Sequence, residues 1–323
     1  MTYNRTLQGR FVSGKWTWLI LLLMSLVLSV AEMLLAPTDR LFSWGGYEVM
    51  LDSAILYSLS LLCYIPVAVI VGAVHLFERR SNWLPTLFIW LVSISFFLYG
   101  ELIVAISTFI MSVAVALLLY CQPGGELERP IYTVFAIVGF SAFILPEFLF
   151  LLPILLIGLF VGNIFSFKRL MAAILGVVTP LWLFYGLEYV YPEAICLFQA
   201  FDTGIDSLFL FYVAEPTLER LLLSAIELLV LLPSIALFVS SPIPSKPLLR
   251  RRMIFIIILD IYLMLLSWLS EENFVLFYAW RLPAVAISAF YLFTVKQTKA
   301  MNIYFVFINL MWLSMAVLGL WLR

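Results

Sequence analysis

Residues 102–120 read LIVAISTFIMSVAVALLLY, with no charged side chain among them. An α-helix needs about 20 mainly apolar residues to cross the hydrocarbon core of a bilayer, so this stretch is long enough for one crossing. Similar stretches recur along the chain, which has 323 residues, 65% hydrophobic and 11% charged, and a mean hydropathy of +1.12. Soluble domains are about 45–50% apolar and about 25% charged. The composition therefore predicts a polytopic membrane protein and excludes a water-soluble globule.

Apolar segments of spanning or near-spanning length follow one another with short connections. They are 16–36, 53–76, 83–98, 102–120, 131–147, 149–166, 170–190, 218–240, 253–270, 274–295 and 302–321. We expect an all-α polytopic bundle of about eleven spans, within a range of nine to eleven, that forms a single integral membrane domain over 1–323. The range reflects breaks at Tyr99-Gly100-Glu101 and at Pro146-Glu147, where a proline and a charge interrupt an apolar run.

The distribution of charge predicts the orientation. Cytoplasmic loops of membrane proteins carry an excess of Lys and Arg. With the N-terminus inside, 14 of the 18 basic residues fall in inner segments: Arg5, Arg10, Lys15, Arg79, Arg80, Arg129, Lys168, Arg169, Lys246, Arg250, Arg251, Arg252, Lys296 and Lys299. Most acidic residues fall outside or at the outer boundary. We therefore expect a multi-pass membrane protein, N-in and C-out.

Two outer connections are long enough to contribute to function. The first, about 37–52, mixes acids with aromatics and contains Asp39 and Arg40. The second, about 191–216, predicts an amphipathic helix at the outer interface near 193–213. Asp202 and Asp206 are four residues apart there, so both carboxylates point the same way. They are candidates for binding a metal or a cationic group, and the alternative is a solvated polar face.

Three ionisable residues fall within predicted spans: Glu227, Asp260 and Arg281. A charge at the centre of a membrane helix costs about 2.5–3.5 kcal/mol on insertion scales, so such residues are rare and usually paired. Because the three belong to consecutive spans, an Arg281–Asp260 or an Arg281–Glu227 pair is expected. The functional interpretation is a buried polar site or proton relay. The alternative is a structural ion pair between helices, or an acid carried protonated.

Other functional classes lack support in the sequence. A net charge of −1 argues against a nucleic-acid partner. Three widely spaced cysteines and a single histidine indicate neither a metal site nor a disulfide framework. The common phosphate-binding, metalloprotease and serine-hydrolase motifs are absent, and no particular cofactor is indicated.

The layout resembles a family of polytopic inner-membrane proteins of Bacteroidetes-type bacteria. Five local patterns carry the resemblance over nearly the full chain: Glu78–Pro85 (ERRSNWLP), Pro146–Leu149 (PEFL), Lys168-Arg169, Thr179-Pro180 and Ser245–Arg252 (SKPLLRRR). The family has no settled activity, so the resemblance implies a location and an architecture but no reaction.

More distantly, the plan is similar to that of membrane glycosyltransferases of the GT-C type, which use polyprenyl-phosphate-linked sugars and carry a catalytic acid in the first outer loop. The resemblance implies that Asp39 is the catalytic acid. Arg40 or Arg220 would meet the lipid phosphate, because a guanidinium group matches phosphate oxygens in a bidentate way. The chain departs from the pattern, since the usual paired acids and an outer acceptor-binding domain are lacking.

Three functions remain open on the sequence alone. The first is a transferase of lipid-linked glycans or related groups at the outer face, which would use Asp39, Asp202 and Asp206. The second is a non-enzymatic component of an envelope assembly, which contacts a protein partner through its acidic outer loops. The third is a transporter that uses the three intramembrane charges. Membrane lipids are expected partners in each.

Overall fold

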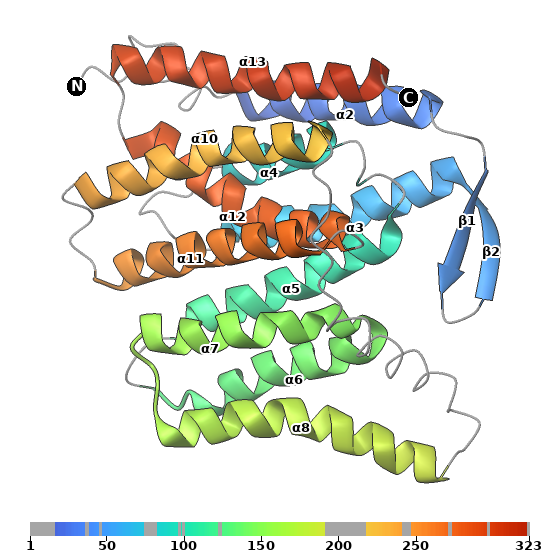
Figure 1. Ribbon diagram of the computed structural model, residues 1–323, viewed down its shortest axis with the longest axis vertical. Helices are drawn as coiled ribbons and strands as arrows, with labels where there is room; N and C mark the ends of the chain where they lie inside the picture. The colour runs from blue at the N-terminus through green and yellow to red at the C-terminus, as the bar shows by residue number, and fades with distance from the viewer. Residues whose placement is uncertain are drawn as a thin grey trace.

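The computed structural model describes residues 17–35, 39–44, 47–73, 83–95, 98, 101–121, 125–190, 218–240, 247–270, 273–295 and 298–321. These residues form a helical bundle with one β-hairpin (Figure 1). The helices are α2 (Thr17–Leu35), α3 (Ser53–Ala73), α4 (Trp83–Ile94), α5 (Leu102–Tyr120), α6 (Glu128–Ile144), the 3₁₀ helix η2 (Pro146–Phe150), α7 (Leu151–Val161), α8 (Phe167–Val190), α10 (Leu218–Ser240), α11 (Pro247–Leu269), α12 (Phe274–Val295) and α13 (Lys299–Trp321).

The helical class predicted from hydropathy is confirmed. Each of the eleven predicted segments overlaps one α-helix of the described chain, and several boundaries coincide, as at 102–120 and 274–295. Five helices are long and apolar enough to cross a membrane: Leu102–Tyr120, Phe167–Leu187, Arg220–Ser240, Pro247–Leu269 and Phe274–Thr294. The break expected at Pro146-Glu147 is present, because α6 ends at Ile144 and Pro146 begins η2.

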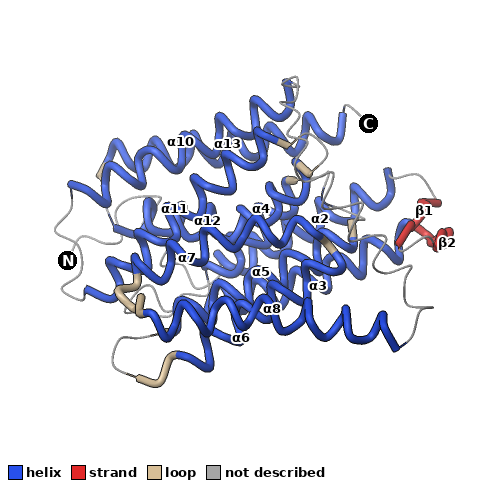
Figure 2. Tube along the Cα trace, turned by 60° about the horizontal axis from the view of Figure 1, so that its bottom comes forward, coloured by secondary structure: helices blue, strands red, loops and turns tan. Residues whose placement is uncertain are grey.

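One short β-hairpin accompanies the helices. Strands β1 (Asp39–Trp44) and β2 (Tyr47–Asp52) pair in antiparallel register, from Asp39 opposite Asp52 to Trp44 opposite Tyr47. The residues between the strands are Gly45-Gly46, and two glycines are typical of a two-residue hairpin turn. The hydropathy pattern alone overlooks this turn signal. Figure 2 shows the hairpin projecting from one end of the bundle.

Helix α12 lies at the centre of the bundle. It packs against α3, α4, α5, α10 and α11, and nearly all of its residues are buried. The pair α2 and α13 lies at one edge of the molecule, and α8, which packs on α6, lies at the other (Figure 1). A charged side chain on α12 is therefore remote from the surface of the bundle.

Charge is distributed unequally between the two ends of the bundle. At the end opposite the hairpin, basic residues begin several helices: Arg129 of α6, Lys168 and Arg169 of α8, the run Arg250–Arg252 of α11 and Lys299 of α13. Two of them bind backbone carbonyls there, since Arg169 donates to Ile164 O at 2.9 Å and Arg251 donates to Gly162 O at 3.4 Å.

Prolines interrupt four of the long helices, at Pro66, Pro180, Pro233 and Pro283. A proline within a helix removes the N–H that would bond the carbonyl four residues earlier. For Pro233 that carbonyl belongs to Leu229, and the Tyr304 hydroxyl of α13 donates to it instead. In a membrane such a substitute donor is needed, because no water is available in the hydrocarbon core.

Candidate functional site: a buried carboxylate–guanidinium triad

Three ionisable side chains meet in the interior of the bundle, each from a different helix. Glu227 comes from α10, Asp260 from α11 and Arg281 from α12. Their exposed fractions are 3%, 1% and 0%, so all three are removed from the surface. Arg281 is among the largest fully buried side chains of the described chain. We call Glu227, Asp260 and Arg281 the triad.

Both ion pairs expected from the sequence are present together. Arg281 Nε donates to Asp260 Oδ1 at 2.5 Å, and Arg281 Nη1 donates to Glu227 Oε2. One guanidinium group thus bridges two carboxylates. With every member ionised, the triad has a net charge of −1, which is costly to bury away from water.

The pairing leaves hydrogen-bonding capacity on every member of the triad. Glu227 Oε1, Asp260 Oδ2 and Arg281 Nη2 are buried and have no hydrogen-bond partner among the described residues. Each carboxylate therefore keeps one oxygen at which a proton can reside. Buried polar atoms are usually bonded, so these three atoms leave the cluster able to form further hydrogen bonds.

Two hydroxyl groups extend the triad toward the hairpin end of the bundle. The Tyr278 hydroxyl interacts with Glu227 and lies 3.2 Å from Ser95 Oγ, just beyond the last residue of α4. Neither residue is among the candidates predicted from the sequence. Tyr278 carries a usable signal, because it precedes Arg281 by three residues and so shares its helix face. Ser95 carries none, since it is 183 residues from Tyr278 in the chain.

Arg220, a predicted phosphate-binding residue, lies near the start of α10. Its guanidinium carbon is 4.7 Å from the centre of the Phe274 ring, at the start of α12. Seven residues separate Arg220 from Glu227, which corresponds to about 10 Å along the helix. Arg220 therefore lies between the triad and the hairpin end of the bundle.

The remaining predicted site residues are only partly located. Asp39 and Arg40 lie in β1, where the register sets them opposite Asp52 and Leu51. Asp202 and Asp206 lie outside the described residues, as does the amphipathic helix expected near 193–213. Of the residues singled out from the sequence, the structure thus brings together Glu227, Asp260 and Arg281.

The described part of the chain shows no cluster of side chains arranged as metal ligands. No group of three or more His, Cys, Asp or Glu side chains is placed there to hold a metal ion. The chemistry that the triad itself offers is the binding and release of a proton, together with hydrogen bonds to a small polar group.

The resemblances to the Bacteroidetes family and to the GT-C enzymes stay predictions. The chain matches no protein-family model, no curated protein and no solved structure.

Proposed function

We propose that the protein is a multi-pass transporter of the cell inner membrane in which the triad carries a coupling proton. The observation that carries the proposal is the charge balance of the triad, in which two buried carboxylates share one guanidinium group. Ionisable residues inside membrane helices commonly mark substrate paths and proton relays. In this proposal eleven helices span the membrane, N-in and C-out, and the basic end of the bundle faces the cytoplasm, in keeping with the excess of Lys and Arg in inner loops.

The charge balance of the triad favours the uptake of one proton. Arg281 stays charged, because a guanidinium group does not deprotonate in proteins. Two carboxylates share this single cation, so burial and mutual repulsion favour a proton on one of them. Glu227 and Asp260 then act as a pair that holds one exchangeable proton, and its loss restores a net negative charge in the interior.

Two prolines near the triad support a change of shape linked to this charge. Pro283 follows Arg281 by two residues on α12, and Pro233 follows Glu227 by six on α10. Helices bend at prolines because the hydrogen-bond ladder is interrupted there. Transporters commonly place substrate and ion sites where helices are broken near the middle of the membrane. We propose that loss of the proton shifts α12 against α10 and α11.

The test is charge displacement after a pH jump, recorded from proteoliposomes on a solid-supported membrane. Proton binding within the protein moves charge even when the transported solute is unknown. We expect a transient current in the wild type and its loss in Glu227→Gln and Asp260→Asn. Glu128→Gln is the matched control, because Glu128 pairs with Arg169 at 3.8 Å at a partly exposed position. A wild-type-sized current in both triad variants contradicts the proposal.

A second candidate function, the transfer of a lipid-linked glycan at the outer face, is favoured by the register of the hairpin. The strands set Asp39 opposite Asp52, next to the start of α3. The sequence alone offers no such pairing of acidic positions. In this proposal Asp39 is the catalytic acid, Arg40 and Arg220 bind the phosphate of a polyprenyl-phosphate-linked substrate, and Asp202 and Asp206 contribute to substrate binding.

The transferase proposal is tested with Asp39→Asn in membranes supplied with polyprenyl-phosphate-linked sugar. We expect loss of sugar transfer while the amount of folded protein is unchanged. Asp52→Asn is the companion variant, because it alters the opposite position of the same register. Full transfer by the Asp39→Asn variant contradicts the role of Asp39.

A further inference from the structure

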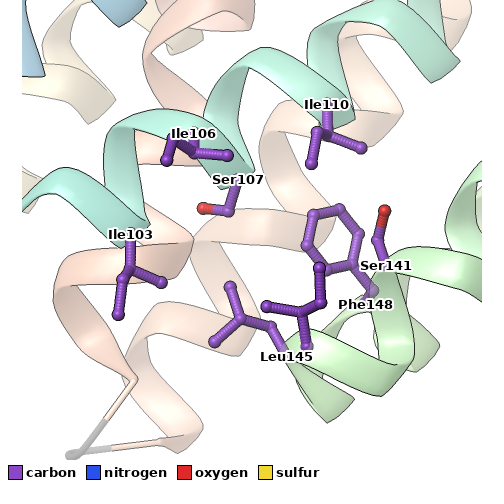
Figure 3. A pocket seen from close by; sticks show the side chains of 8 residues that line it. Ile103, Ile106, Ser107, Ile110, Ser141, Leu145 and Phe148 are labelled. Atoms are coloured by element: carbon purple, nitrogen blue, oxygen red, sulfur yellow. The ribbon is translucent and has the colours of Figure 1, made fainter. Parts of the chain in front are cut away.

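A pocket of about 350 Å³ lies between α5, α6 and η2 (Figure 3). Aliphatic side chains and one aromatic ring make up most of its wall: Ile103, Ile106, Ile110, Ile144, Leu145 and Phe148. Ligand pockets in proteins measure about 300–1,000 Å³, so this volume is enough for one small ligand or one chain of a larger one.

The two serines in the wall offer no free hydrogen-bond donor to a ligand. Ser107 Oγ donates to Val104 O at 2.8 Å and accepts a hydrogen bond from Trp280 Nε1 at 3.0 Å. Ser141 Oγ donates to Ile137 O at 2.8 Å. Because both hydroxyl protons are engaged within the protein and the rest of the wall is apolar, the pocket favours a ligand portion without polar atoms.

The mouth of the pocket lies on the flank of the bundle. Ile106 and Ile144 are 42% and 53% exposed, so the wall is continuous with the outer surface of α5 and α6. Ile103 to Ile110 occupy the first half of α5, which is long and apolar enough to cross a membrane. With α5 across the membrane, as proposed above, the pocket opens toward the hydrocarbon of the bilayer, on the half nearer the hairpin end of the bundle.

The inner wall is fixed by aromatic packing against the central helix. The ring centres of Phe148 and Trp280 are 4.8 Å apart, and Trp280 also bonds Ser107. Trp280 precedes Arg281, so the same turn of α12 supports the pocket and carries the cation of the triad. A wall held at two points resists collapse, which keeps the pocket open.

We propose that this pocket is a binding site for one acyl chain of a membrane phospholipid. Its volume, its apolar wall and its mouth within the hydrocarbon region each fit a single saturated or unsaturated chain. The head group stays outside the pocket, at the hairpin end of the bundle. The site is distinct from the proposed proton site, and the proposal stands without it.

The experiment is native mass spectrometry of the full chain, purified in a delipidating detergent and then offered phospholipid or polyprenyl phosphate separately. We expect the wild type to retain one phospholipid. Ile110→Trp, which fills the pocket, should lose that adduct. Ile174→Trp is the matched control, because Ile174 is an exposed isoleucine on α8, away from the pocket. Ile103→Phe provides a second, milder filling variant in case Ile110→Trp does not fold.

Each outcome decides the proposal. Loss of the phospholipid adduct in the filling variants but not in Ile174→Trp supports it. An equal adduct in all four proteins overturns it, because the lipid is then bound over the general surface. Retention of polyprenyl phosphate in place of phospholipid also overturns it and assigns the pocket to a lipid-linked substrate. Glu227→Gln alters the proton site but not the lining of the pocket, so it should retain the adduct. A failure of the proton proposal is therefore distinguishable from a failure of the lipid proposal.

Discussion

Neutralising the carboxylates of the triad one at a time and then together should give strongly non-additive changes in stability. The variants are Asp260→Asn, Glu227→Gln and the double variant. Each single change replaces one acid by its amide and leaves Arg281 paired with the other carboxylate, so the cluster stays neutral and holds no exchangeable proton. The double change leaves a buried guanidinium group without a counter-charge.

The expected magnitudes follow from the contacts. A hydrogen bond to a charged group contributes about 1.5–3 kcal/mol to stability. Each single variant keeps a polar amide beside Arg281 and leaves it one carboxylate, so we expect a net cost of no more than about 1.5 kcal/mol, at the lower end of that range. Leaving one partner of a buried ion pair uncompensated costs about 3–5 kcal/mol. The second neutralisation should therefore cost at least about 1.5 kcal/mol more than the first, within the coupling of about 0.5–3 kcal/mol found for residues of one network.

The assay is equilibrium unfolding in mixed micelles of a mild and a denaturing detergent, with the free energy of unfolding compared across the four proteins. Glu128→Gln provides the reference for a partly exposed ion pair and should change that free energy by about 0.2–1 kcal/mol. If the free energy lost in the double variant equals the sum of the two single losses, the reasoning is refuted. Arg281 would then gain the same stabilisation from each carboxylate whether or not the other is present.

Two further predictions concern the packing of α8 and the reactivity of one thiol. A Cβ atom at Gly176 would lie 2.6 Å from the Tyr132 carbonyl oxygen, whereas a Cβ atom at Gly186 would meet open space. Gly176→Ala should therefore destabilise the protein by about 1–3 kcal/mol in the same unfolding assay, and Gly186→Ala should not. Burial raises the pKa of the Cys121 thiol, which lowers its thiolate fraction at neutral pH. In a variant with the other two cysteines replaced by serine, Cys121 should therefore react with iodoacetamide more slowly in the folded protein than after unfolding.

The positions of the helices could be predicted from the sequence because the bilayer imposes one simple rule on every segment. A helix satisfies its own backbone hydrogen bonds, so any apolar run long enough becomes helical in hydrocarbon. This is why 102–120 and 274–295 coincide with α5 and α12. The same rule does not apply outside the hydrocarbon core, and there the prediction overlooked the hairpin, whose sequence signal is local turn chemistry.

The candidate site could be predicted in part, because charge marks some of its members and not others. Glu227, Asp260 and Arg281 are conspicuous in apolar helices, and their opposite charges predict that they meet. Ser95 carries no charge that would single it out, and serine occurs throughout membrane helices. Serine hydroxyls there frequently donate to a carbonyl of their own helix, as Ser95 Oγ does to Leu91 O at 3.0 Å. Its contact with Tyr278 follows from tertiary packing alone.

The excess of carboxylate is what separates a titratable site from a structural ion pair. A buried arginine needs one carboxylate for charge balance, and a second adds repulsion and a further cost of desolvation. Replacing the second acid by its amide would keep a hydrogen bond to Arg281 and remove that cost. A cluster built only for stability has no use for the extra charge, whereas a proton-binding site requires it. Single neutralisation should therefore leave the fold nearly intact and abolish the response to protons, and this combination is what a purely structural ion pair cannot produce.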